Sequence, residues 1–376
     1  TTANVLAIVE NTGATFTTAS NYAVTLSDTA SAANANTIMG DTTGIVTATV
    51  TATGVVSALN TALSNATATS ALTMVLDATA ATAAQLNTLN GKTSVAINAA
   101  SINTVTGVAA DAVTLYQGSG VSGLANEAIT VDSGTLTVSQ HNVLDALSTG
   151  VITATIDEGD LSTLATLANA NTNNVLTVTV TESAGTAVAA TVLSTLGGKS
   201  YGAGVVTVSN AIVISGTTAQ LTAALVTSAS KVIAATALIT GTGTDMTVAE
   251  LNALDDTTSG IITATLVTAA TADYSSLTDD SGNNVLTITI NDAASTSITA
   301  AALSTIGGKT DGVVTVTSAI VVTGSTAQLT AALVTANTLV VAGTATGTIS
   351  DADDVSIAAT ALSAIGGKTS GAITVT

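Results

Sequence analysis

The sequence repeats itself at two nested periods. The strand-like run Asn174–Val180 returns as Asn284–Ile290, and Ser194–Ser200 returns as Ser304–Thr310, so both copies are offset by 110 residues. Within this supra-repeat, runs of β-branched residues recur at spacings of roughly 23 to 33 residues. A unit of that length cannot close a core alone and must stack on its neighbours. The two periods therefore predict an elongated repeat solenoid, one continuous array over residues 1–376 with about 14 coils of about 27 residues.

One coil shows the expected local structure. Val313–Thr317 is β-branched throughout, which favours a strand. In Ser325–Gln328 a hydroxyl is followed three residues later by Gln, the pattern of a capping box, and Leu329 and Leu333 then fall on one helical face. The same spacing recurs ahead of paired leucines at Thr82/Gln85, Thr137/Gln140, Thr217/Gln220 and Thr247/Glu250, with leucines at 86/89, 144/147, 221/225 and 251/254.

Helical crossovers between successive strands predict a parallel β-sheet with short helices, an α/β solenoid. A fully β-solenoid with short 3₁₀ turns in place of the helices is the alternative.

Glycines end several of the helical stretches, at Gly197, Gly307 and Gly366, where we expect a left-handed backbone.

A Gly-Lys-Thr/Ser motif follows those helices at Lys92, Lys199, Lys309 and Lys368. A phosphate-binding loop needs another glycine five positions before the one preceding the lysine, and leucine stands there in every copy. The motif therefore predicts a helix end, with the lysine close to the negative pole of the helix dipole.

Composition excludes several function classes. The chain has 24 acidic residues against five lysines and a net charge of −19, which opposes binding to nucleic acid or to anionic membranes. Polar residues interrupt each apolar run before the length of a transmembrane helix, so no membrane insertion is expected.

The chain has no cysteine, which suits an exported bacterial protein. It opens directly into repeat sequence, so a removed signal, an export signal beyond its end and a longer parent chain are all open.

No residue is predicted to be catalytic. His141 is the one histidine, lacks partners for a triad or zinc site, and is expected on an exposed helical surface. The carboxylate pairs Asp255/Asp256 and Asp279/Asp280 have no aromatic lining to suggest a glycosidase. We expect neither an enzyme nor a cofactor-binding protein, calcium apart.

Acidic loops could hold calcium weakly, because they bring several hard oxygen ligands together. None has the spacing of an EF-hand or of a calcium-binding nonapeptide repeat, so solvated turns that keep the protein dissolved are the alternative. The candidate ligands are Asp157, Glu158, Asp160, Asp279, Asp280, Asp351, Asp353 and Asp354.

Strand alternation predicts faces of stacked threonines. In Ile261–Leu266 one face carries Ile262, Ala264 and Leu266, and the other carries Ile261 with two threonines. Thr177/Thr179, Thr287/Thr289 and Thr315/Thr317 repeat the pattern. Such a Thr-x-Thr array resembles the ice-binding surface of β-solenoid antifreeze proteins, and threonine is also simply favourable on an exposed strand.

The motif Leu-x-x-Leu-x-Gly-Lys-Thr-x-Gly, followed by Val-x-Val and later by Gly-Thr-x-Ala-x-Leu, resembles the Thr/Ala-rich repeats of giant secreted cell-surface proteins of marine cyanobacteria, of the swimming-associated surface protein type. The resemblance implies an extracellular or cell-surface location and a structural or adhesive role. It leads to two hypotheses: a building block of a filament, sheath or surface layer, and an adhesin that binds glycan, calcium or ice. Strands expected at Asn4–Val9 and at residues 372–376 suggest self-association into a homopolymer.

Overall fold

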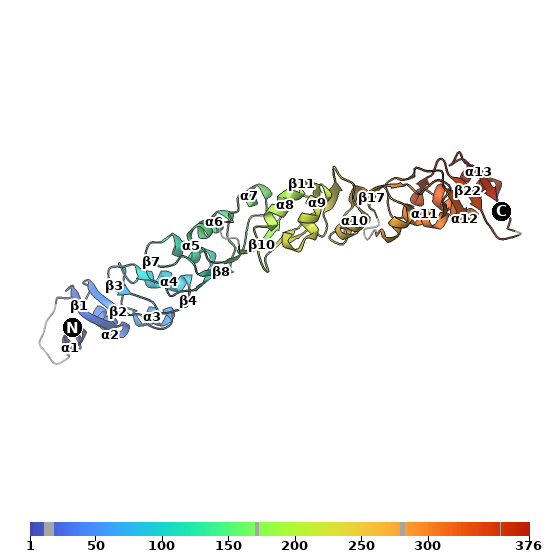
Figure 1. Ribbon diagram of the computed structural model, residues 1–376. Helices are drawn as coiled ribbons and strands as arrows, with labels where there is room; N and C mark the ends of the chain where they lie inside the picture. The colour runs from blue at the N-terminus through green and yellow to red at the C-terminus, as the bar shows by residue number, and fades with distance from the viewer. Residues whose placement is uncertain (11–18, 170–172, 279–282, 354) are drawn as a thin grey trace. The chain divides into compact units, whose positions relative to one another are not determined.

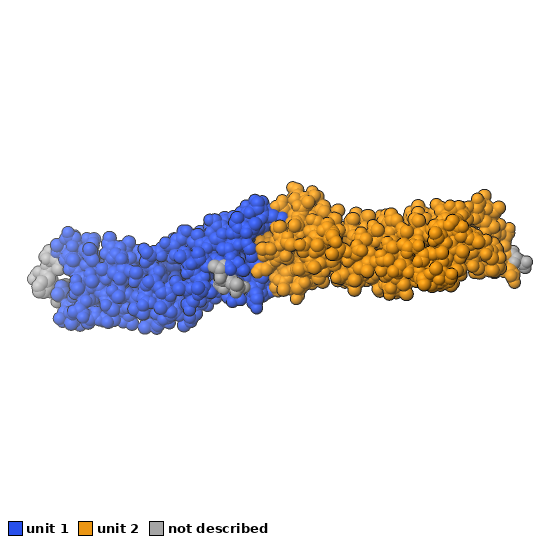
Figure 2. Space-filling model, turned by 45° about the horizontal axis from the view of Figure 1, so that its top comes forward, with its two compact units in different colours: residues 1–178, 199–205 blue, residues 179–198, 206–376 orange. Residues whose placement is uncertain are grey.

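A computed structural model describes residues 1–10, 19–169, 173–278, 283–353 and 355–376. The fold is α/β, with parallel sheets and short helices, as the sequence predicts (Figure 1). Two compact units are present, residues 1–178 with 199–205 and residues 179–198 with 206–376 (Figure 2). We call each strand, or pair of successive strands, together with the turn before it and the helix after it, a segment. The single continuous solenoid stays a prediction.

The elements up to residue 180 are α1 (Thr2–Val9), β1 (Val24–Ser31), α2 (Ala32–Asp41), β2 (Val46–Thr51), α3 (Val56–Ala62), β3 (Ala71–Met74), β4 (Ala80–Thr82), α4 (Ala83–Asn90), β5 (Ile97–Asn98), β6 (Thr104–Val108), α5 (Ala109–Gln117), β7 (Val121–Ser122), β8 (Ala128–Ser133), α6 (Val138–Leu147), β9 (Ile152–Thr155), α7 (Leu161–Leu164) and β10 (Val175–Val180).

The elements that follow are β11 (Ala187–Ala189), α8 (Ala190–Gly197), β12 (Val205–Val208), β13 (Val213–Gly216), α9 (Thr218–Leu221), η1 (Thr222–Val226), η2 (Ser228–Ser230), β14 (Val232–Ile233), β15 (Leu238–Gly241), α10 (Val248–Asp255), β16 (Ile262–Thr265), η3 (Thr271–Ser276), β17 (Val285–Ile290), β18 (Ser297–Thr299), α11 (Ala300–Gly307), β19 (Val314–Val316), β20 (Val321–Gly324), α12 (Thr326–Leu333), η4 (Ala336–Thr338), β21 (Val340–Val341), β22 (Thr346–Ile349), α13 (Ala359–Gly366) and β23 (Ile373–Val375).

The strands of neighbouring segments pair with one another in parallel. In the first unit the orders are β1-β2-β3, β4-β6-β8-β9-β10 and β5-β7. In the second unit they are β11-β13-β15-β16-β17-β19-β21, β18-β20-β22-β23 and β12-β14. Parallel strands cannot be joined by a tight hairpin, so between two strands that pair with one another the chain passes through loops and at least one short helix.

The capping boxes predicted from sequence are present at all five positions. Thr82, Thr137, Thr217, Thr247 and Ser325 each accept a hydrogen bond from the backbone N–H three residues later, and the Gln or Glu there reaches back to the N-cap N–H. Two otherwise unpaired N–H groups are satisfied at each helix start. This explains why helices of only one to three turns begin at these residues.

Small aliphatic side chains fill the core. Ile262, Ala264 and Leu266 are buried, whereas Thr263 and Thr265 on the same stretch are exposed, which confirms the predicted alternation. The predicted leucine pairs after the capping boxes are buried with one exception. Leu147 is 45% exposed, because it is the last residue of α6 and lies beyond the buried face of that helix.

One predicted strand is wrong. Residues Asn4–Val9 belong to α1, whose N-cap Thr1 accepts a hydrogen bond from the Asn4 N–H. A local cap and helix-forming residues outweigh the β-branched residues of this short run. The strand expected near the other end is present as β23, which pairs with β22.

Core leucines should tolerate little loss of volume, because their neighbours are already small. We expect Leu333→Ala to lower the free energy of unfolding by about 2–5 kcal/mol, since Leu333 is buried on α12. Leu147→Ala is the matched control and should cost below about 0.5 kcal/mol. Urea unfolding measures both, and equal costs would show that the helix register is wrong.

Candidate functional site

The hydroxyl of the Gly-Lys-Thr/Ser motif is buried and joins two neighbouring segments. Thr310 Oγ1 donates to the carbonyl oxygen of Asn284 at 2.9 Å and accepts from the N–H groups of Leu286 and Gly312, at 2.7 and 2.8 Å. Equivalent hydroxyls donate to a carbonyl of the preceding segment at Thr42, Thr93, Ser148, Ser200, Thr258 and Thr369. The hydroxyl that a phosphate-binding loop would offer to a metal ion is thus bonded to backbone groups.

Glycines in and after this motif permit close approach between segments. A Cβ on Gly312 would lie 2.1 Å from the Leu286 carbonyl oxygen, and one on Gly307 would lie 2.3 Å from that of Thr338. The left-handed backbone expected at Gly197, Gly307 and Gly366 is wrong, because each is the last residue of its helix and none has a positive φ. Glycine is needed here for space rather than for a positive φ.

The chain offers a matched test of this packing. Gly307 and Gly366 end equivalent helices, but nothing lies within 4 Å of a Cβ on Gly366. We expect Gly307→Ala to destabilise the second unit by about 1–3 kcal/mol through overpacking. Gly366→Ala should be neutral or stabilise by up to about 1 kcal/mol, because alanine favours helices. Thermal unfolding compares the two, and equal effects would contradict the close-contact argument.

Lysines of the motif bind the helix end of a neighbouring segment. Lys92 Nζ donates to the Leu63 carbonyl at 2.8 Å, and Lys199 Nζ donates to those of Ala165 and Leu167, at 2.9 and 2.5 Å. Leu63 and Ala165 are the C-caps of α3 and α7, so each lysine meets the dipole of the preceding helix rather than of its own. Partial burial lowers the pKa of Lys199.

Several acidic side chains cap the helix of the preceding segment. Asp351 accepts from the N–H of Thr326 at 3.1 Å and from its hydroxyl, and Glu158 accepts from the N–H of Val138 at 2.8 Å. Each donor is the first residue of its helix, where a negative charge also meets the positive pole of the helix dipole. Asp28 on Thr2 and Asp292 on Thr271 repeat the contact. We call these contacts inter-segment caps.

These contacts account for part of the predicted calcium ligands. Glu158 and Asp351 are inter-segment caps, and Asp160 caps its own helix α7, where hydrogen bonds from Thr163 and Ser162 lower its pKa. Asp157 and Asp353 lie in loops, whereas Asp279, Asp280 and Asp354 fall outside the described residues. Among the residues that the structure describes, no three acidic or histidine side chains gather as a metal site. Calcium binding stays a prediction.

Asparagines on helices bridge to the next helix. Asn142 Nδ2 donates to the Thr166 carbonyl at 3.0 Å, and its Oδ1 accepts from the Ala168 N–H at 2.7 Å. Asn252, one supra-repeat later, makes the same pair of bonds to Ser276 and Thr278. An amide side chain suits this position because it satisfies one donor and one acceptor of a loop at once.

A buried Asp–Asn pair also recurs at the 110-residue period. Asn174 donates to Asp145 Oδ1 at 2.7 Å and accepts from the Ile152 N–H at 2.9 Å. Asn284 does the same with Asp255 and Ile262, at 2.8 Å each. Asp255 is thus buried and bonded to Asn284 of the next segment. Asp255 and Asp256 therefore do not form a pair of accessible carboxylates for acid–base chemistry.

His141 is fully buried, which corrects the expected surface position. His141 lies four residues after the N-cap of α6. At the equivalent position, α4, α10 and α12 carry the buried leucines Leu86, Leu251 and Leu329. Its Nε2 lies 3.4 Å from Asn174 Nδ2. Burial lowers the pKa of His141, so the ring is held neutral in the folded protein.

This burial gives stability a specific pH dependence. Above the ordinary histidine pKa of about 6.5, the ring is neutral in both states and contributes no slope. Below it, only the unfolded chain takes up the proton, so the free energy of unfolding falls with decreasing pH, by at most about 1.4 kcal/mol per pH unit, until the lowered folded pKa is reached. We expect His141→Leu, which introduces the residue found at the equivalent position 251, to remove this slope in urea unfolding between about pH 7.5 and 5.5. An unchanged slope would contradict the buried neutral ring.

Another buried acid, Glu127, pairs with a tyrosine. Glu127 Oε1 accepts from the Tyr116 hydroxyl, and Oε2 accepts from the N–H groups of Ala125 and Asn126, at 2.8 and 3.1 Å. Burial and this hydrogen bond raise the pKa of Tyr116. All these partners belong to α5 and the turn before β8, so the cluster fixes a turn rather than presenting groups to a substrate.

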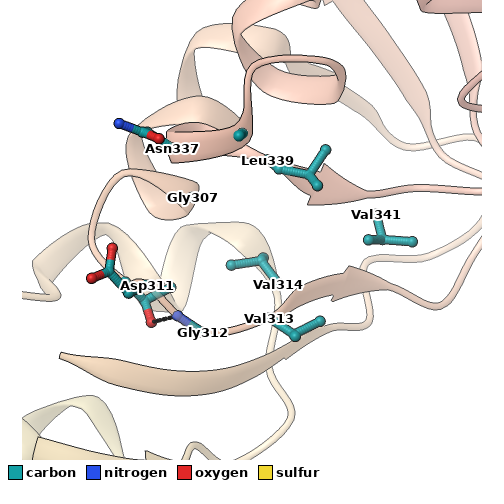
Figure 3. A pocket seen from close by; sticks show the side chains of 10 residues that line it. Gly307, Asp311, Gly312, Val313, Val314, Asn337, Leu339 and Val341 are labelled. Atoms are coloured by element: carbon teal, nitrogen blue, oxygen red, sulfur yellow. Dashed lines mark hydrogen bonds between the residues drawn. The ribbon is translucent and has the colours of Figure 1, made fainter. Parts of the chain in front are cut away.

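A pocket of about 240 Å³ opens between the turn after α11 and the chain leading into β21 (Figure 3). Asp311 contributes the one titratable side chain of its lining, and Asn337 adds an amide. General acid–base catalysis in this pocket would lack a second titratable group. Apolar walls come from Val313, Leu339 and Val341.

Comparison with protein-family models, curated proteins and solved structures found no match. In the described part of the chain, no helix is both long and apolar enough to cross a membrane.

Proposed function

We propose that this chain is a non-enzymatic structural protein, a solenoid building block of an extracellular filament, sheath or surface layer. The observation that carries the proposal is the use of its polar side chains. Threonine hydroxyls, asparagine amides, carboxylates and lysines repeatedly bond the backbone of an adjacent segment. These are the residue types from which catalytic and metal sites are made, and here they bond adjacent segments to one another.

Three further features support this function. The core consists of repeated small side chains, so segments of similar shape can be added without redesign. The net charge of −19 keeps such an array dissolved until specific faces meet. The resemblance to giant cell-surface repeats supports an extracellular location. We further propose that the partner of the protein is another copy of itself, so that it assembles into a homopolymer.

A ligand-binding adhesin is the second candidate, and one observation favours it. Exposed threonines lie in register across neighbouring strands, as in Thr29, Thr49 and Thr73 on β1, β2 and β3. A regular array of hydroxyls and methyls is a surface on which ordered water, ice or a glycan could bind. Calcium in the acidic loops belongs to this candidate as well.

Purified protein separates the two candidates. Negative-stain microscopy should show regular multimers if the chain is a building block. Monodisperse monomers, with a melting temperature that rises in millimolar calcium or with added glycan and falls in EGTA, would instead assign a binding function through mass-action linkage. We expect multimers and a melting temperature that EGTA leaves unchanged, because two of the predicted ligands already cap helices.

A further inference from the structure

The outward side of four strands in the second unit forms a continuous uncharged surface. Each of its residues lies on or directly beside β16, β17, β19 or β21, and each is exposed or half-buried. We call this surface the outer sheet face. Its members are Ile261, Thr263, Thr265, Val285, Thr287, Thr289, Val313, Thr315, Thr317, Leu339 and Val341.

An aliphatic stripe crosses the outer sheet face diagonally. Ile261, Val285, Val313 and Val341 are among the large hydrophobic side chains that the structure leaves exposed, Val313 by 57%. Val285 pairs with Thr263, two residues beyond Ile261, and Val341 pairs with Thr315, two residues beyond Val313. Because Ile288 pairs with Val314, Val313 lies opposite Thr287, two residues beyond Val285, so the same two-residue step recurs. Threonines therefore flank the stripe on the neighbouring strands.

We propose that the outer sheet face binds the same face of a second copy of this chain. Two molecules with a net charge of −19 repel each other, so a stable lateral contact requires surfaces without carboxylates. The outer sheet face has none among its members, whereas Asp292 and Asp351 lie beyond the strands and cap helices. Charge thus selects this face for a partner of the same sequence.

The shape of the face suits a self-complementary contact. A two-fold axis along the diagonal would lay the aliphatic stripe of one copy on that of the other, with threonines on either side, which is an isologous arrangement. β-Branched side chains lose little rotamer freedom when covered, because they are already stiff on a strand. The pocket lined by Val313, Leu339 and Val341 can accept apolar side chains of the second copy. Asp311 also lines this pocket (Figure 3).

The inference rests on the proposed function, because lateral contact is how a building block would form a layer or a bundle. Glycan binding is the less favoured occupant, since the outer sheet face offers no aromatic side chain on which a sugar ring could stack. Ice remains an outcome of the test, because threonine and valine arrays could also order water.

Two double variants test the proposal in the full chain. Thr263→Lys with Thr287→Lys places charges on the outer sheet face, and Ala301→Lys with Thr305→Lys places the same charges on the exposed side of α11. Sedimentation velocity over a concentration series should show association for the wild type and the α11 variant. The face variant should associate about tenfold more weakly or worse, because like charges would meet across the contact.

A cysteine reporter covers the case in which lysines unfold the sheet. The chain has no cysteine, so Thr287→Cys and Ala301→Cys each carry one thiol. A short bismaleimide should cross-link Thr287→Cys into dimers and leave Ala301→Cys monomeric, with circular dichroism confirming that both are folded.

Other results would overturn the lateral contact in distinguishable ways. Assembly of the folded face variant equal to that of the α11 variant would overturn it while leaving the building-block function in place. A wild type that stays monomeric at every concentration would overturn both. Thermal hysteresis from a monomeric wild type, lost in the face variant, would assign the face to ice instead.

Discussion

Parallel strand pairing between successive segments is the constraint on which this structure depends. A single parallel strand has no partner of its own and leaves its N–H and C=O groups unpaired until the next segment arrives. Strands in one sheet lie about 4.8 Å apart, so the turns that follow the helices must also come close. A Cβ on residue 312 would clash with the Leu286 carbonyl oxygen. The glycine at this position is a direct result of that spacing.

Polar side chains then fix the order of the segments. A typical hydrogen bond contributes only about 0.5–1.5 kcal/mol, but a buried polar group left without a partner costs about 1–3 kcal/mol. A buried Asn174 or Asp145 is therefore tolerated only when the adjacent segment is in the correct position. Apolar packing alone would allow similar segments to slip past one another, so these groups fix the register between adjacent segments.

Local signals in the sequence were sufficient for much of the fold. Capping boxes, strand alternation and the α/β class depend on residues close together in the chain, and all are present in the structure. The inter-segment contacts were missed, because the partners of Asp351 and Lys199 lie 25 to 34 residues away and no local rule pairs them. His141 could have been placed correctly: it stands four residues after a capping threonine, where the other helices carry a core leucine.

Comparison of the two supra-repeats within this one chain separates what the fold requires from what it leaves free. The contacts that join adjacent segments recur at the 110-residue offset. Asn142 and Asn252, Asp145 and Asp255, and Ser200 and Thr310 make equivalent hydrogen bonds. Some side chains next to these contacts differ, since buried His141 is replaced by Leu251 and exposed Tyr201 by Asp311. What the repeat preserves is the set of contacts between each segment and the next, as expected where a short unit buries its core only against its neighbours.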